Sequence, residues 1–259
     1  MRTPDTVPPL YFASAPYANQ LPLAQFIPEG GANAHLLMAA TPSRVLALLR
    51  DGSADAVLLP VAALSCQRDL EQIEGLGVCA MRQVRSVLLK CRTPLREVRT
   101  VETDPASLSS NALVRVLFRH LWKLPVTFVA PGTTAHPDAV VMIGDRALCA
   151  PPSAAGDIDL ASAWHALTGL PFVFAVWVHR RGHPEATALA HIAHAALRLG
   201  EARLPLLATQ VARQLGLAET TCLDYLTSCI SFRVGDRERE GMQQFLQMVA
   251  ACPGVSRES

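Results

Sequence analysis

The apolar positions of the chain fall into short runs separated by turns, and one run is clearer than the others. Phe172 to Val178 contains no charged residue, and Gly169 and Pro171 mark a turn directly before it. Uninterrupted apolar residues at strand length indicate a strand that is buried on both faces. Such strands are typical of mainly parallel sheets covered by helices, so the run predicts an α/β fold.

Shorter apolar runs bounded by turn residues predict the other strands. They fall at residues 10–14, 56–59, 84–91, 98–102, 126–129 and 139–143. A helix is predicted over 41–51, because Pro42 suits its first turn and Gly52 its end. From His183 onward the pattern is helical almost to the end of the chain, with little β-branching.

The order of these elements predicts two lobes. Residues 88–175 are expected to form a second lobe, inserted between the two parts of a first lobe, 1–87 and 176–259. The chain would cross between the lobes near 84–91 and again near 172–179. A ligand cleft is expected between lobes that are joined in this way.

Composition excludes several classes of partner. The chain has 259 residues, of which 50% are apolar and 17% charged, and its formal net charge is +1. No overall field therefore attracts nucleic acid or an anionic membrane. No run approaches the roughly 18 apolar residues of a membrane span. Met1 to Pro9 holds three prolines and two charged residues in place of a signal peptide's apolar core, so a cytoplasmic protein is expected.

The sequence predicts neither a metal nor a cofactor. The seven cysteines are odd in number and never form Cys-x-x-Cys, a pattern that suits reduced thiols. His191 and His194 lie three residues apart, but no Cys, Asp or Glu stands nearby with ligand spacing. A phosphate-binding glycine loop and Gly-x-Gly-x-x-Gly are both absent from the sequence.

Five segments, in order along the chain, carry a resemblance to a known family. They are 15–23 (APYANQLPL), 104–110 (DPASLSS), 138–148 (DAVVMIGDRAL), 168–179 (TGLPFVFAVWVH), and 225–232 (YLTSCISF) followed by 241–245 (GMQQF). In these segments the chain resembles the chorismate dehydratases of the futalosine-dependent menaquinone pathway. The resemblance implies a two-lobed, periplasmic-binding-protein type II-like fold, in which helices flank mixed sheets and a ligand cleft separates the lobes.

The same resemblance implies an activity. The family removes water from chorismate to give 3-[(1-carboxyvinyl)oxy]benzoate, with no cofactor and with aromatisation of the ring as the driving force. A carboxylate of the substrate itself is proposed to take the proton in this family. The expected partner is therefore a small molecule, while the oligomeric state has no signal in the sequence.

A serine-rich stretch is the first candidate for substrate binding. Ser107, Ser109, Ser110 and Asn111 precede an apolar helix face that runs to about Trp122. One serine could cap this helix and do nothing else. Three serines exceed what one cap needs, and free N–H groups with the helix dipole form an anion site. With the resemblance, all four residues are predicted to bind substrate.

Three other residues are candidates. Asn19 follows the first strand in a loop, where Asn is common for turn geometry alone. The resemblance implies that Asn19 faces the substrate, and that Ser86 does so at the start of the crossing strand, so both are predicted to be catalytic. Asp145 could bind substrate or cap a helix. The nearby pair Asp157 and Asp159 is predicted to lie in a solvated loop.

The sequence also departs from the family. Arg82 and Gln83 stand where the family has Gly and Pro, and Val61-Ala-Ala63 stands where it has Ser and an acidic residue. Both changes are expected at the rim of the cleft, where they affect substrate identity more than fold. Three alternatives remain: a sister enzyme acting on a cyclic futalosine derivative, a non-catalytic binding protein for an aromatic or dicarboxylic metabolite, and a regulator's sensing domain.

Overall fold

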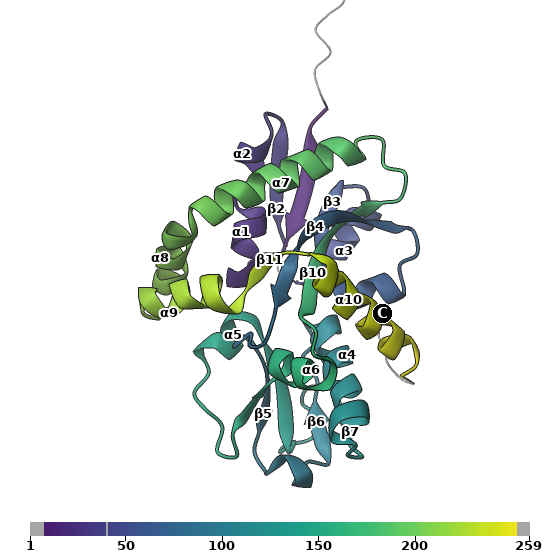
Figure 1. Cartoon of the computed structure of the whole chain (residues 1–259), viewed down its shortest axis with the longest axis vertical. Helices are drawn as coiled ribbons and strands as arrows, with labels where there is room; N and C mark the ends of the chain where they lie inside the picture. The colour runs from purple at the N-terminus through teal and green to yellow at the C-terminus, as the bar shows by residue number, and fades with distance from the viewer. Residues whose placement is uncertain (1–7, 40, 253–259) are drawn as a thin grey trace, which may run out of the picture.

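The computed structural model describes residues 8–39 and 41–252, and their strands form two separate sheets, one above the other in Figure 1. The larger sheet has six strands in the order β11-β4-β10-β3-β1-β2. These are β1 (Leu10–Ser14), β2 (Ala34–Met38), β3 (Ala56–Pro60), β4 (Leu70–Ala80), β10 (Phe172–Arg180) and β11 (Ser231–Arg233). The sheet is mixed, because β1 runs parallel to β2 and β3 whereas β10 is antiparallel to β3 and β4.

The smaller sheet has five strands in the order β7-β6-β8-β5-β9. They are β5 (Val87–Cys91), β6 (Thr100–Glu102), β7 (Thr127–Val129), β8 (Ala139–Ile143) and β9 (Asp157–Asp159). β6 is parallel to β7 and β8, and β5 is antiparallel to β8 and β9. The predicted α/β class with mixed sheets is confirmed.

β10 is the strand that the long apolar run predicts. Its first eight residues are buried, as expected for a strand covered on both faces. The expectation of a mainly parallel setting is wrong, because β10 is antiparallel to both of its neighbours. Burial on both faces shows that other elements cover the strand, but it does not determine whether the strand runs parallel or antiparallel to its neighbours.

The chain passes between the two sheets twice. It leaves the larger sheet after β4, through residues 81–86, and returns to it from α6 (Leu160–Thr168) through 169–171. The predicted lobe boundary between 175 and 176 falls inside β10, which pairs along its length with strands of the larger sheet. The division of the chain into two domains at 87/88 and 175/176 stays a prediction.

Helices pack around both sheets. α7 (Ala186–Ala202) crosses the larger sheet and contacts α1 (Leu21–Ala24), α2 (Ile27–Gly30) and β4 (Figure 1). The remaining helices are α3 (Pro42–Arg50), α4 (Leu108–Leu117), α5 (Gly144–Cys149), α8 (Leu204–Leu215), α9 (Glu219–Asp224) and α10 (Asp236–Ala250). Shorter helical turns are η1 (Ala18–Gln20), η2 (Val61–Ser65), η3 (Leu95–Glu97), η4 (Phe118–Trp122) and η5 (Tyr225–Cys229).

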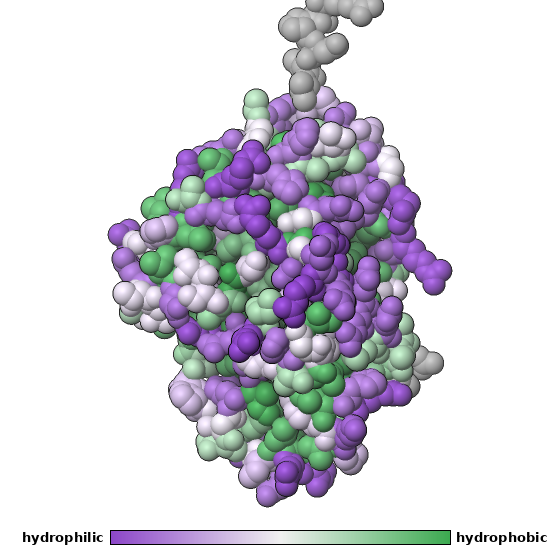
Figure 2. All heavy atoms as spheres, viewed as in Figure 1, coloured by the Kyte–Doolittle hydropathy of each residue, from purple (hydrophilic) through white to green (hydrophobic). Residues whose placement is uncertain are grey.

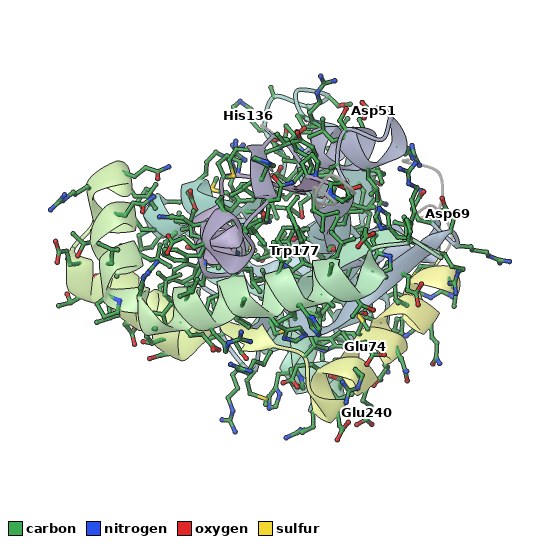
Figure 3. The ribbon with its side chains drawn as sticks, turned by 90° about the horizontal axis from the view of Figure 1, so that it is seen from above. Asp51, Asp69, Glu74, His136, Trp177 and Glu240 are labelled. Atoms are coloured by element: carbon green, nitrogen blue, oxygen red, sulfur yellow. The ribbon has the colours of Figure 1, made fainter. Side chains whose placement is uncertain are left out.

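Aromatic side chains fill the core between these layers. Trp164 of α6 contacts the rings of Phe172 and Phe245 edge to face, so that it joins α6, β10 and α10. Its indole N–H donates to the Pro171 carbonyl at 3.1 Å, which satisfies the one polar atom of a fully buried ring. Figure 3 shows Trp177 near the centre of the molecule, and Asp51, Asp69 and Glu240 at its periphery.

The surface and the helices both bear on whether the chain could cross a membrane. On the face seen in Figure 2, hydrophobic residues are interspersed among hydrophilic ones. Of the helices in the described ranges, none combines the length and the apolar character that crossing a bilayer requires.

The expectation of a solvated loop at Asp157 and Asp159 is wrong. Both residues lie in β9, which pairs with β5. Asp157 accepts a hydrogen bond from the Lys90 ammonium at 2.6 Å. Asp159 caps α6 and also accepts from the Arg85 N–H at 2.7 Å. The two carboxylates are therefore bound within the fold, where their partners come from distant parts of the chain.

Candidate active site

Two hollows lie between the sheets, where a ligand cleft is predicted. The inner hollow has a volume of about 60 Å³ and the outer one about 880 Å³. They adjoin, because Pro60, Ala106 and Ser107 line both. The polar side chains of the inner hollow are Tyr17, Asn19 and Gln20 from the loop after β1, and Ser107, Ser109 and Ser110 from the start of α4.

Ser107 is the cap of α4, as the sequence predicts. Its hydroxyl oxygen accepts a hydrogen bond from the Ser110 N–H at 3.2 Å, and its carbonyl accepts from the Asn111 N–H at 3.2 Å. Within the described ranges no acceptor binds the N–H groups of Leu108 and Ser109. These two donors and the positive end of the helix dipole are available to an anion beside both hollows.

The Ser109 hydroxyl is already used within the protein. It accepts from the Ala62 N–H at 3.0 Å and donates to the Phe174 carbonyl at 3.2 Å. It thereby ties α4 to η2 and β10, which belong with the other sheet. Ser109 lines the inner hollow with 2% of its surface exposed, so that its backbone N–H is the group left for a ligand.

The next two predicted residues, Ser110 and Asn111, have different places in the site. Ser110 is buried and lines the inner hollow, while Asn111 lines the outer one. The Asn111 amide donates to the Asp104 carbonyl at 2.8 Å and accepts from the Asp104 N–H at 3.0 Å. Asn111 therefore closes the loop that positions Ser107. The prediction that these residues bind substrate stays a prediction.

Tyr225 connects the two residues predicted to be catalytic. Asn19 lines the inner hollow, whereas Ser86 is fully buried beside Val87, which lines it. The Tyr225 hydroxyl donates to the Ser86 hydroxyl oxygen at 2.7 Å, and the Asn19 side chain lies near the same hydroxyl. Burial raises the pKa of Tyr225, so the phenol stays protonated and orients the Ser86 hydroxyl.

Tyr17 approaches the site over a glycine. Gly144 has a φ of +64°, and a Cβ there would lie 2.7 Å from the Tyr17 ring. Only glycine combines this backbone conformation with so close a contact. Burial, with the nearby carboxylates of Asp104 and Asp145, raises the pKa of Tyr17. Its phenol is therefore a proton donor at the wall of the inner hollow.

Asp145 holds the loop that carries Asn19. Its carboxylate accepts a hydrogen bond from the Ala18 N–H at 3.0 Å, and burial raises its pKa. Asp145 lines neither hollow, so the structure places it behind the loop. Its contact with substrate stays a prediction.

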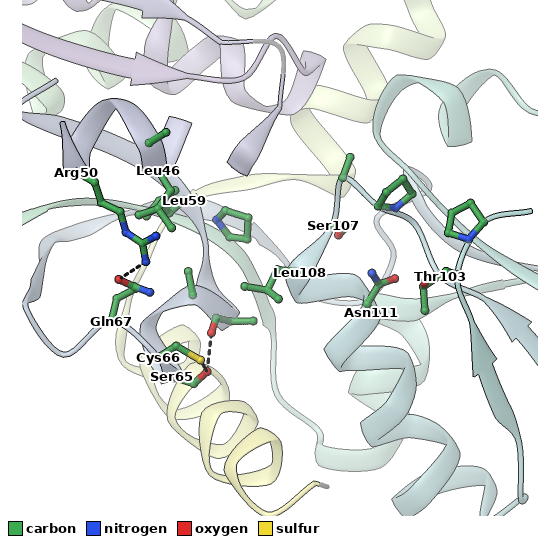
Figure 4. A pocket seen from close by; sticks show the side chains of 18 of the residues that line it. Leu46, Arg50, Leu59, Ser65, Cys66, Gln67, Thr103, Ser107, Leu108 and Asn111 are labelled. Carbon is green, nitrogen blue, oxygen red and sulfur yellow. Dashed lines mark hydrogen bonds between the residues drawn. The ribbon is translucent and has the colours of Figure 1, made fainter. Parts of the chain in front are cut away.

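The outer hollow is a mainly apolar groove, drawn in Figure 4. Leu46 of α3, Leu59 of β3 and Leu108 of α4 contribute large apolar side chains. Arg50 lies at one end of the groove, where it donates to the Gln67 side chain at 3.0 Å (Figure 4). Of the described residues that line the groove, Arg50 is the only cation.

The departures from the family pattern lie in different surroundings. Arg82 and Gln83 are exposed in the connection 81–86 and line neither hollow, so their expected place at the cleft rim is not observed. Ala62 and Ala63 line the outer hollow. The described ranges contain no group of three or more His, Cys, Asp or Glu that could hold a metal ion.

Three residues of the site were not singled out by sequence reasoning. Tyr17 and Tyr225 both stand in segments that carry the family resemblance, which was the available signal. Gln20 stands in the same segment as Tyr17, but its contacts depend on how the loop folds back on β1.

Comparisons with known proteins agree along the chain. A curated chorismate dehydratase of Thermus thermophilus is 29% identical over 253 residues, covering 89% of this chain and 92% of that protein. Another, from Campylobacter jejuni, is 31% identical over 174 residues, covering 64% of this chain and 66% of the relative.

Solved structures show the same fold at low identity. A protein from Archaeoglobus fulgidus, AF1704, has a TM-score of 0.69 at 12% identity, covering 93% of this chain and 97% of its own. The periplasmic aliphatic sulphonate binding protein of Escherichia coli has a TM-score of 0.63 at 16% identity, covering 97% and 95%. The periplasmic-binding-protein-like fold is thus confirmed. A profile of the family described as Menaquinone biosynthesis matches residues 10–251, and the chain belongs to that family.

Proposed function

We propose that the chain is a chorismate dehydratase, a carbon–oxygen lyase of menaquinone biosynthesis. Relatives of that name match it over up to 89% of its length. The observation that carries the proposal is the lining of the inner hollow. It combines a helix start with free N–H groups and several neutral donors, and its described lining contains no Lys, Arg, His, Asp or Glu.

The reaction is an elimination that the protein can promote by positioning. Chorismate carries two carboxylates, an enolpyruvyl ether on one ring carbon and a hydroxyl on the next. The C–H bond at the ether carbon and the C–O bond of the hydroxyl break, and water leaves. The ring becomes aromatic in 3-[(1-carboxyvinyl)oxy]benzoate. The protein's task is orientation and stabilisation of shifting charge, with no covalent intermediate.

The proton acceptor is proposed to come from the substrate. Tyr17 is the one titratable side chain in the described lining of the inner hollow, and its raised pKa makes it a donor, not a base. A substrate carboxylate is then the available base. The Tyr17 phenol can donate to the departing hydroxyl, and Asn19 can orient the reacting end, with Ser86 and Tyr225 behind it.

The α4 start supplies the site for the other carboxylate. Its free N–H groups and the helix dipole bind an anion without a cationic side chain. The inner hollow, at about 60 Å³, is smaller than the roughly 300 Å³ of a small ligand pocket. Substrate must therefore extend toward the outer hollow, or the sheets must separate to admit it.

The proposed function also implies a cellular compartment. All seven cysteines are free, which is typical of proteins in a reducing compartment, and supports action in the cytoplasm. The segments that resemble the family support the futalosine-dependent branch of the pathway.

The decisive experiment is incubation of the purified protein with chorismate. We expect release of 3-[(1-carboxyvinyl)oxy]benzoate, detected by chromatography with mass measurement. Asn19→Ala is expected to lower kcat on the order of a hundredfold, by analogy with loss of one oxyanion-hole donor, and to affect affinity for product less. Protein that binds chorismate but never forms the product would be a binding protein.

A second function is favoured by one observation. The outer hollow of about 880 Å³ could hold a ligand larger than chorismate, such as a cyclic futalosine derivative. Parallel incubation with that compound separates the two. Turnover of the larger compound alone would assign the chain to the sister reaction.

A further inference from the structure

Gln20 ends η1 at the wall of the inner hollow. Its side chain comes from the larger-sheet side of the cleft, and 8% of the residue's surface is exposed. The neighbouring Asn19 lines the same hollow and lies near the Tyr225 hydroxyl. The Gln20 amide is therefore a second polar group at the same wall, with partners of its own.

The orientation of this amide is fixed by its surroundings. Its oxygen accepts a hydrogen bond from the Ser14 hydroxyl at 2.7 Å and another from the Ala15 N–H at 3.2 Å. A backbone N–H can only donate, so the atom facing Ala15 must be the amide oxygen. The NH₂ group consequently occupies the other position.

The NH₂ group has no partner among the residues that the structure describes. No acceptor for it occurs within residues 8–39 and 41–252, and it is not one of the fully buried side-chain atoms there that lack a partner. Its nitrogen is therefore accessible, and the inner hollow is the space that Gln20 lines. A preorganised donor, held by two hydrogen bonds on its oxygen, costs little reorganisation when a ligand binds.

We propose that Gln20 binds a carboxylate oxygen of the substrate and sets the preference for a dianionic ligand. The inference rests on the proposed function. A substrate with two carboxylates needs two sets of donors, and the described lining of the inner hollow has no cation to serve either. The α4 start serves one carboxylate. The Gln20 NH₂ group, on the opposite side of the cleft, serves the other.

Gln20→Glu tests this with little change of structure. The introduced carboxylate keeps an oxygen for Ser14 and Ala15, while the donor becomes a negative charge that faces an anion. KM for chorismate is expected to rise on the order of 10- to 100-fold, with a smaller change in kcat and with Tm nearly unchanged. Gln243→Glu, an exposed position on α10, is the matched control and should leave KM unchanged.

The pH dependence of the variant separates binding from a structural role. Burial raises the pKa of a carboxyl group, so acidification should protonate the introduced group and restore a donor. The KM of Gln20→Glu is therefore expected to fall toward that of wild type between pH 8 and pH 5.5, more than wild type itself changes. Should this variant not fold, Gln20→Met removes the same donor without charge, and KM should still rise.

The outcomes also separate this inference from the proposed function. If wild type forms product and Gln20→Glu keeps its KM at every pH, Gln20 has no part in binding and the dehydratase stands. If wild type binds chorismate without turnover, the dehydratase proposal fails, and calorimetric Kd values of the two proteins still test Gln20. If wild type neither binds nor converts chorismate, both fail.

Discussion

At the scale of single residues, the site is built from hydrogen bonds that leave one group free at each position. Ser107 uses its hydroxyl as a cap and leaves two N–H groups of α4 open. Gln20 uses its oxygen and leaves its NH₂ group open. At each position, the hydrogen bonds on one atom fix the direction in which the free N–H donor points.

Tyr225→Phe removes the hydroxyl that donates to Ser86 and lies near Asn19. We expect kcat for chorismate to fall about tenfold with KM nearly unchanged, because Ser86 stays in place but loses its fixed orientation beside Asn19. The free energy of unfolding should fall by about 1 kcal/mol, as for one hydrogen bond. Steady-state kinetics and urea unfolding measure the two effects.

Tyr11→Phe is the control for this variant, because Tyr11 is partly exposed and lines neither hollow. Equal kinetics for Tyr225→Phe and wild type would mean that Tyr225 has a structural role only.

The sequence predicted these residues unevenly. The Ser107 cap follows from local spacing, because the hydroxyl bonds a group three residues along the chain. Tyr17 depends on Gly144, and Ser109 on Ala62 and Phe174, none of which is near in sequence. Contacts of this kind form only when the two sheets come together, so residue spacing carries no signal of them.

At the scale of elements, the Ser109 hydroxyl forms the side-chain hydrogen bonds that join α4 to η2 and β10. Ser109→Ala leaves the Ala62 N–H and the Phe174 carbonyl without that partner, which should cost about 1–3 kcal/mol of stability. Ser107→Ala removes a cap and should cost about 1 kcal/mol. We expect Ser109→Ala to lower Tm more, and Ser107→Ala to raise KM more.

Thermal unfolding and KM for chorismate check this pair. Ser162→Ala is a suitable control, because this exposed serine lies in the first turn of α6, where Asp159 provides the cap. If Ser107→Ala melts earlier and yet binds chorismate as wild type does, the start of α4 is a cap alone.

Helices and strands could be predicted where the hydrophobic pattern or the capping residue lies within the element itself. β10 and β8 are uniform apolar runs, and α3 has Thr41 as a cap that accepts from the Arg44 N–H. β4 was missed, because Glu71, Glu74 and two glycines interrupt its pattern. β9 and β11 are short strands at the edges of their sheets. Their own sequence has no strand pattern, and they become strands only by pairing with a neighbour.

At the scale of the whole molecule, we expect Asp145 to make the free energy of unfolding depend on pH. It links the loop after β1 to the end of β8, and burial raises its pKa above the unfolded value. A carboxyl group whose pKa is higher in the folded than in the unfolded state stabilises the fold while it is protonated. This stabilisation is fully present below the unfolded-state pKa and is lost as pH rises through the folded-state pKa. Asp145→Asn keeps an oxygen for the Ala18 N–H and cannot ionise.

The Tm of Asp145→Asn relative to wild type is therefore expected to be higher at pH 8 than at pH 4, which scanning calorimetry at the two values measures. A difference that stays constant with pH would show that the Asp145 carboxylate is not destabilised by burial.

The fold class could be predicted from the sequence, since apolar runs and turn residues specify it, and neighbours at 12% and 16% identity share the fold. The arrangement of the strands could not. Their order in the larger sheet, β11-β4-β10-β3-β1-β2, brings together strands from both ends of the chain. Nothing within a single strand encodes which distant strand it will pair with.

The two connections between the sheets begin at neighbouring points, since Phe172 at the start of β10 pairs with Ala80 at the end of β4. If the two sheets rotate relative to one another, connections this close together would define one axis, and groups far from it would move further than groups near it. A ligand held by both sheets would then oppose the rotation more strongly the further it lies from that axis. We expect the residence time of product to depend on that rotation, so that opening of the cleft and release of product would be the slowest step of turnover.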